Sequence, residues 1–583
     1  MSFWFAGGFL DRGAVQAERP WRGSLVGASV TILSGLVASG AFAQVVIPNG
    51  GFSDGEVLAD GVSLTVESGG TISSAVPGGN AVDANSGGSN AVSNAGLISG
   101  PGPLDNGVAL SNGTSISVTN SGRIVGSSAG ISGSVAGDDI SSLLNVSTGI
   151  IDGSSGISLS FGSLSNANNA GQIVGHGFSG IFLGPGGTLS NLTNSGQIEG
   201  SSNGISADSI LGLTNLAGGT IAGLFADGII VTGTSLGNLT NAGLISGGGG
   251  RGIYVPSDNL YNFANLSTGI VRGNTTGIEA GGTVGLFSNA GQIIGLTDYG
   301  LSIINGGLLL GENQQGGVIS GADSGISLTN SYILRFTNAG QITGGTFNGI
   351  VSTGGDITEL TNLSSGLIRG AYVGIAANGG ADLEDLVNSG VIETTASGDT
   401  SGIQVFSGGT GDLINLINTG TIRSVGDGSG FNKYGIGVIG GRIDNLNNSG
   451  TIEAENTGAG QAYGIYGTNL VSLTNSGRIF ANLGAGNFAI AEGGGADTDL
   501  TLLPGSVIQG QIELGNVANT DRLFAGYGLN LATTFQTALP DLIETYGALM
   551  ATNGTMVAVA DTSALTAEGN AWSDMMRGVS GSL

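Results

Sequence analysis

One short unit recurs through most of this chain: an asparagine, any residue, a glycine and, two positions further on, usually an isoleucine. Internal repetition constrains a fold strongly, because every copy must adopt the same structure and pack against its neighbours. Seventeen glycines in phase between Gly96 and Gly505 give a period of about 26 residues. The clearest copies begin at Asn94, Asn120, Asn169, Asn194, Asn241, Asn289, Asn338, Asn388, Asn418, Asn448 and Asn475.

Two further markers keep the same period. A Gly-Ile pair recurs in step with the unit, and apolar residues precede each asparagine, as Leu189 and Leu192 precede Asn194. Each period therefore holds three short apolar segments separated by turns rich in Gly, Asn and Ser. Degenerate copies, interpreted as keeping the glycine and losing the asparagine, occur at Gly149, Gly219, Gly269, Gly317, Gly366 and Gly505.

The apolar segments are too short for helices, since none keeps a 3.6-residue period over ten residues. They suit short strands with one face inward, and such strands become stable when identical coils stack about 4.8 Å apart. A leucine-rich repeat would need a helical segment in each unit, for which the turns leave no room. We therefore predict an all-β chain, a single-stranded right-handed parallel β-helix (solenoid) of about seventeen coils and about 80 Å.

The repeated glycine and asparagine are predicted to be scaffold residues. Sharp turns between strands need positive φ, which glycine adopts freely and asparagine tolerates best among the other residues. Stacked asparagine side chains can also bond to the copies above and below. The Asn-Leu-Ser and Asn-Leu-Thr tripeptides match glycosylation acceptors, but their phase with the repeat favours the structural interpretation.

Composition argues against several classes of function. Glycine makes up 116 of 583 residues, yet 40% of the chain is hydrophobic and 9% charged, unlike a disordered chain. A net charge of −27 and a single lysine argue against nucleic-acid binding. We interpret the acidity as solubility of a large surface, with weak divalent-cation binding as the alternative. The chain has no cysteine, hence no disulfide or thiolate site.

The N-terminus has the layout of a secretory signal peptide. Arg19 and Arg22 precede an uncharged stretch at 24–40, which small residues at Ala41 and Ala43 follow. We expect cleavage after Ala43, because the stretch is short and diluted by Gly and Ser for an uncleaved membrane anchor. The predicted regions are a signal peptide at 1–43, an N-terminal cap with first irregular coils at 44–93, the repeat array at 94–510, a C-terminal cap or folding region at 511–560 and a linker helix at 561–583.

The pattern changes near residue 490. The segments Leu503-Pro-Gly-Ser-Val-Ile508, Asn530-Leu-Ala-Thr-Thr-Phe535 and Val557-Ala-Val-Ala-Asp561 follow, and then an amphipathic stretch through Trp572 and Met576. Together with the Asn-x-Gly repeat, these segments resemble the passenger domains of type V autotransporters of Gram-negative bacteria. The resemblance extends over nearly the whole chain after the signal peptide.

The resemblance implies a route of export. In that family the last coils promote folding, and the helix after them passes through an outer-membrane β-barrel translocator encoded in the same chain. Such a barrel needs alternating strands of about ten residues, and the sequence ends at Leu583, where it would begin. We therefore expect passage through the periplasm to the cell surface, the outer membrane or the medium, with a barrel supplied in cis beyond Leu583 or in trans.

Few residues suit catalysis, and we predict no catalytic, cofactor or metal site. The single histidine, His176, is interpreted as a turn residue and not as part of a Ser-His-Asp triad. Asp497 and Asp499 could bind calcium, although a turn is favoured. The candidates for a carbohydrate-active site, for which solvated outward side chains are the favoured interpretation, are Glu359, Arg369, Asp382, Glu384 and Asp385.

Contact residues are expected in inserted loops, because loops on rigid scaffolds carry recognition. The longest repeat intervals are 390–420 and 420–450. We predict a non-enzymatic adhesin or stalk that contacts a host surface or a glycan. The alternative is a carbohydrate-active β-helix enzyme, which usually grows longer asymmetric loops than these regular intervals allow. The predicted contact residues are Phe431, Lys433 and Tyr434 in one patch, and Arg251 and Tyr254, with Tyr261 and Phe263, in a second.

Overall fold

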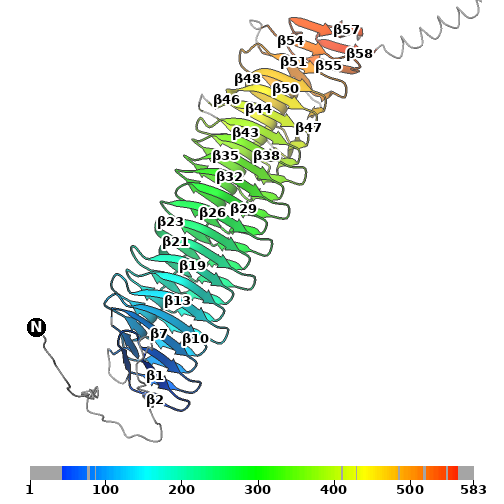
Figure 1. Cartoon of the computed structure of the whole chain (residues 1–583). Coiled ribbons are helices and arrows are strands. Elements are labelled where there is room, and N and C mark those ends of the chain that lie inside the picture. The colour runs from blue at the N-terminus through cyan, green and yellow to red at the C-terminus, as the bar shows by residue number, and fades with distance from the viewer. Residues whose placement is uncertain are drawn as a thin grey trace, which may run out of the picture.

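The computed structural model describes residues 43–561, except 75–78, 86, 407, 409–410, 429, 483–485, 516–519 and 547–548. These residues form an elongated stack of coils (Figure 1), built from strands and without a helix. Apart from Ala43 and Asp561, the predicted signal peptide and linker helix lie outside the described residues. No helix long and apolar enough to cross a membrane is found in the described part of the chain.

Each coil consists of three short strands, and each strand pairs in parallel with its counterpart in the next coil. Three sheets result, called here face 1 (strands that end on the repeat asparagine), face 2 (strands with the repeat isoleucine) and face 3 (the remaining strands). A representative coil contains β10 (Ser115–Asn120), β11 (Arg123–Gly126) and β12 (Ala129–Gly133). Their partners are β13 (Asp139–Asn145), β14 (Ile150–Gly153) and β15 (Ser155–Leu159).

Face 2 shows the number of coils. In the described part of the chain it contains nineteen strands, from β2 (Phe52–Ser53) to β52 (Val507–Gln509). Residues 44–93 already form coils, because Ile47 and Val66 are in register with the later asparagines. The predicted seventeen coils are counted from Gly96, so these earlier coils account for the difference. Nineteen coils give a rod of about 90 Å. The predicted parallel β-solenoid is therefore confirmed, with a slightly larger number of coils.

Faces 3 and 1 join wherever one long strand continues through the corner between them. This happens in two regions, one near the middle of the rod and one under the longest inserts. The long strands are β21 (Ile205–Asn215), β23 (Ile229–Asn241), β46 (Lys433–Asn448) and β48 (Ala462–Asn475).

The interior is a continuous column of aliphatic side chains. The central isoleucine of successive face-2 strands, as at Ile124, Ile151 and Ile173, has no exposed surface. Full burial of each such side chain contributes about 1.5–3 kcal/mol, and every coil adds inward residues from all three faces. Stacking therefore stabilises strands that are too short to stand alone.

A ladder of buried asparagines runs along the turn between faces 1 and 2. Each Nδ2 donates to Oδ1 of the asparagine in the next coil at 2.7–2.9 Å, without a gap, so the predicted amide ladder is confirmed. The ladder consists of Asn94, Asn120, Asn145, Asn169, Asn194, Asn215, Asn241, Asn265, Asn289, Asn313, Asn338, Asn362, Asn388, Asn418, Asn448 and Asn475.

Two sequence interpretations of this turn are wrong. Five of the six degenerate copies keep the ladder asparagine, as in Asn145 and Gly149, but it lies four residues before the glycine instead of two. Only in the copy at Gly505 is the asparagine replaced, by Leu502. The glycine of the Asn-x-Gly copies is not at positive φ. It is needed because a Cβ on Gly122 or Gly196 would collide with the carbonyl oxygen of the equivalent glycine one coil below.

The C-terminal end of the stack changes from parallel to antiparallel pairing. There β58 (Met556–Ala560) pairs antiparallel with both β55 (Leu531–Phe535) and β57 (Leu549–Asn553). The switch lies within the predicted folding region at 511–560.

Candidate functional site

Lys433 is not on the surface that we predicted it to share with Phe431. It is fully buried at the start of β46, below the longest inserts. Its Nζ donates to the carbonyl oxygens of Ala396 and Gly398 at 2.8 and 3.1 Å and to Thr400 Oγ1 at 3.0 Å. The lysine therefore holds the insert of the preceding coil in place.

The surroundings of Lys433 are polar but closed. Thr400 Oγ1 lies 2.6 Å from Ser424 Oγ, so the ammonium and two hydroxyls form a buried network. Burial lowers the pKa of Lys433, while Asp399 and Asp427 act in the opposite direction. Because no surface of Lys433 is exposed, its amine is not available to a partner in solution.

Phe431 and Tyr434 differ in their exposure. Phe431 is about half exposed (51%) on the insert. Tyr434 instead starts a row of stacked rings on face 3, with its centroid 5.1 Å from that of Tyr463, which lies 5.6 Å from that of Phe488. Burial, together with the neighbouring hydroxyls of Tyr434 and Tyr466, raises the pKa of Tyr463 to about 12. The ring faces contact each other, so they contribute mainly to packing between coils.

The second predicted patch is divided between faces. The Arg251 guanidinium lies 4.0 Å from the ring centroid of Tyr254 and forms two hydrogen bonds of 3.1 Å with Glu279 on the next coil. Tyr261 is exposed on face 1, whereas Phe263 is buried and stacks on a neighbouring phenylalanine. Only Arg251 and Tyr254 are therefore in direct contact.

The five candidates for a carbohydrate-active site do not form one cluster. Glu359, Glu384 and Asp385 lie on face 1, where Glu359 pairs with Arg335 at 2.7 Å. Asp382 Oδ1 accepts the backbone N–H of Asp412 at 2.8 Å in the turn before that face.

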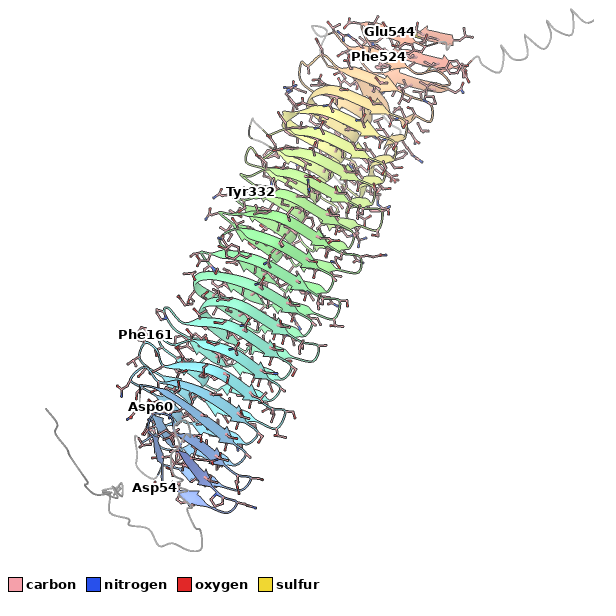
Figure 2. All side chains as sticks on the ribbon, in the orientation of Figure 1. Asp54, Asp60, Phe161, Tyr332, Phe524 and Glu544 are labelled. Atoms are coloured by element: carbon pink, nitrogen blue, oxygen red, sulfur yellow. The ribbon has the colours of Figure 1, made fainter. Side chains whose placement is uncertain are left out.

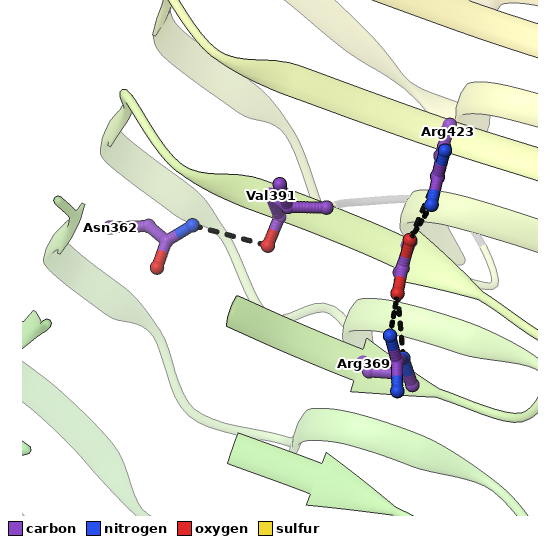
Figure 3. Close-up of polar contacts among 5 residues, drawn as sticks. Asn362, Arg369, Val391 and Arg423 are labelled. Carbon is purple, nitrogen blue, oxygen red and sulfur yellow. Dashed lines mark hydrogen bonds and ion pairs between the residues drawn. The ribbon is translucent and has the colours of Figure 1, made fainter. Parts of the chain in front are cut away.

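Arg369, the fifth candidate, lies on face 2 (Figure 3), in β39 (Leu367–Gly370). Its Nε donates to Glu393 Oε1 at 2.6 Å, and Arg423 Nε donates to the other carboxylate oxygen at 2.8 Å. Burial opposes ionisation of Glu393, but the two arginines hold its pKa below the ordinary value. This charge row connects three coils and is separate from the acids of face 1.

The remaining candidates take part in surface contacts. His176 is exposed in a turn, with Nε2 2.8 Å from Asp152 Oδ1. Asp497 Oδ1 accepts the backbone N–H of Thr520 at 2.8 Å, and Asp499 lies 3.5 Å from Arg522. Among the described residues no group of three His, Cys, Asp or Glu is placed to hold a metal ion.

A hollow in the surface lies on face 1, around Tyr261 of the second predicted patch. It is an open groove of about 610 Å³. Around it, over six consecutive coils, large apolar side chains project outward. These residues form the apolar stretch of face 1: Leu211, Tyr261, Leu286, Leu310 and Leu334, each 44–52% exposed. Tyr332, labelled in Figure 2, is a further exposed aromatic residue at the start of β35 (Tyr332–Asn338).

The sequence indicates the apolar stretch only when positions are counted back from the ladder asparagine of each coil. Its residues occupy the third and fourth positions before the ladder asparagine, which point outward from the coil of Asn145 onward. In the coils on either side of the stretch the third position holds a polar residue, namely Asn166, Asn191, Glu359 and Asp385. No family model, no curated protein and no solved structure matches the chain.

Proposed function

We propose that the chain is an exported, autotransporter-like passenger that acts as an adhesin or structural stalk at the cell surface or in the medium. The observation that carries the proposal is the unbroken ladder from Asn94 to Asn475, which keeps the outward side chains in rows along one rod. The signal-like segment before Ala43 and the resemblance of the C-terminal segments support export.

The dispersal of the charged candidates favours this function over a carbohydrate-active enzyme. General acid–base cleavage of a glycosidic bond needs two carboxyl groups within about 5–10 Å across one sugar. Here Glu359 and Asp385 are register partners on face 1, but Glu359 is paired with Arg335 and Asp385 accepts a hydrogen bond from Asn415, while Arg369 lies on face 2. A regular rod with exposed side chains on every face suits contact with a partner.

Export is tested by expressing the full chain in a Gram-negative host and measuring the mass of the product from each cell fraction. We expect an N-terminus at Gln44 in the exported material. The variant Ala43→Arg disrupts the small residue at the cleavage position and should leave the chain unprocessed. A wild-type chain that stays unprocessed in the cytoplasm would contradict the proposal.

Binding is tested with labelled protein on host cells and on a panel of immobilised glycans. Phe431→Ala should reduce binding if the insert makes the contact, and Phe161→Ala is the matched control, since Phe161 is equally exposed (53%) on another coil. Incubation with acidic polysaccharides separates the two classes of function. Unsaturated or reducing-end products that disappear in Glu384→Gln would favour the enzyme.

A further inference from the structure

The outward side chains four residues before the ladder asparagine alternate in size along the centre of face 1. In five successive coils this position is occupied by Leu211, Gly237, Tyr261, Gly285 and Leu309. Large and small residues alternate, and the order is the same from either end, with Tyr261 in the middle. Such a row is complementary to itself when it is turned around and shifted by one coil, because each large residue then faces a glycine.

The two glycines create hollows on either side of Tyr261. Both line the groove of about 610 Å³, together with Tyr261 itself. The hollows are fixed by the backbone, because a Cβ on Gly237 would lie 2.6 Å from the carbonyl oxygen of Leu211, and one on Gly285 would lie 2.5 Å from that of Tyr261. Tyr261 is 52% exposed and projects between them.

We propose that face 1 binds face 1 of a second copy of this chain in antiparallel orientation. A two-fold axis that lies in the plane of the interface, perpendicular to the rod axis and between the coils of Tyr261 and Gly285, places Tyr261 of each copy over Gly285 of the other. The same axis places Leu309 over Gly237. Tyr261 and Leu309 then fill the hollows at Gly285 and Gly237, and the contact removes the apolar side chains around the groove from water. Exposed apolar stretches of this extent mark interaction sites, and an isologous dimer is the commonest symmetric assembly.

The charges beside the apolar stretch favour the antiparallel orientation. On its C-terminal side the rows of face 1 become acidic, at Glu359 and Asp385, whereas on its N-terminal side they hold Asn166 and Asn191. With the proposed axis, the coil of Glu359 faces that of Asn191, and the coil of Asp385 faces that of Asn166. A parallel overlap would place each carboxylate opposite its own copy, which is repulsive.

The area of face 1 is sufficient for a stable dimer. The overlap from the coil of Asn166 to that of Asp385 covers ten coils, about 48 Å, and a six-residue strand is about 20 Å wide. The product is roughly 900 Å² per chain, close to the ~800 Å² per partner of standard interfaces. The proposal concerns the folded rod alone and does not depend on export.

Sedimentation of the full chain over a range of concentrations up to about 100 µM tests for the dimer. Tyr261→Glu should raise the dissociation constant at least tenfold, because it introduces a charge at the centre of the contact. Phe225→Glu is the matched control, since Phe225 is an exposed aromatic (81%) in the turn between faces 2 and 3 and should not affect dimerisation. A wild-type chain that stays monomeric at every concentration, or equal effects of both variants, would overturn the proposal.

Orientation is tested with single cysteines, which are unambiguous because the chain has none. Asn166→Cys and Asp385→Cys both replace exposed side chains. A short bis-maleimide should cross-link a mixture of the two variants and neither variant alone. Cross-linking of each variant with itself would show a parallel dimer and would refute the antiparallel arrangement.

Discussion

Asn169 is fully buried, so each polar atom of its side chain needs a partner inside the protein. Its Oδ1 accepts from Asn145 at 2.7 Å, and its Nδ2 donates to Asn194 Oδ1 at 2.8 Å and to the carbonyl oxygen of Gln197 at 3.1 Å. The side chain thus bonds to the coils on both sides.

Asn169→Leu should lower the free energy of unfolding by about 3 kcal/mol, because it leaves an amide and a carbonyl of the neighbouring asparagines without their partner. Urea-induced unfolding followed by circular dichroism measures the change. Asn168→Leu, at the exposed adjacent position of the same strand, should change the free energy by less than about 0.5 kcal/mol. Equal effects of the two variants would show that the ladder does not contribute to stability.

Two glycines distinguish the two reasons for glycine in these turns, which are a lack of space for a Cβ and a positive φ. Gly196 has an ordinary φ but no space for a Cβ, whereas Gly218 has a φ of +84° and open space around it. Gly196→Ala should lower the free energy of unfolding by about 3 kcal/mol or more through backbone displacement, and Gly218→Ala by about 1–2 kcal/mol through strain. Urea midpoints compare them, and the reverse order would restore the positive-φ explanation.

At the scale of the strand, the row of Arg369, Glu393 and Arg423 connects β39, β42 (Val391–Thr394) and β45 (Thr421–Gly426). Glu393→Gln should lower the free energy of unfolding at pH 7 by about 1–2 kcal/mol, because it removes the charge that both arginines share. Glu359→Gln, in an exposed pair, is the control and should cost less than about 0.5 kcal/mol.

The pH dependence of this effect has a definite sign. The pKa of Glu393 is lower in the folded chain than its ordinary value, so its contribution is present above that value and decreases as the pH falls through the folded-state pKa. The difference between wild type and Glu393→Gln should therefore shrink in urea titrations as the pH is lowered from 7 to about 3. A difference that stays constant over this range would contradict the assignment.

The sequence predicts the coil more reliably than the surface. Short apolar segments, the period and the asparagine ladder follow from the repeat, because every copy repeats the same local constraint. The burial of Lys433 does not follow from its residue type. Its alignment with Ala462, which is buried in the next coil, does indicate that this position points inward. The apolar stretch of face 1 requires knowledge of which positions are adjacent across coils, and variable turn lengths hide this in the sequence.

For the whole molecule, the repetition means that coils are interchangeable. Asn169 and Asn194 are in register, and each is followed by a small residue, Gly, Gln and Ile. Deletion of residues 170–194 should therefore give a folded rod one coil shorter, whereas deletion of 170–182 should disrupt the stack, because it joins strands of different faces. Circular dichroism and small-angle X-ray scattering measure folding and length. A misfolded product of the first deletion would contradict the equivalence of the coils.

The continuous asparagine ladder also affects how such a molecule can change over generations. Because neighbouring coils are in register at the asparagine, a change that adds or removes one whole coil leaves the asparagine ladder continuous across the altered position. The reach of the rod then varies in steps of about 4.8 Å, while its two ends remain as they were. Length becomes a trait that selection can adjust without altering how the chain folds.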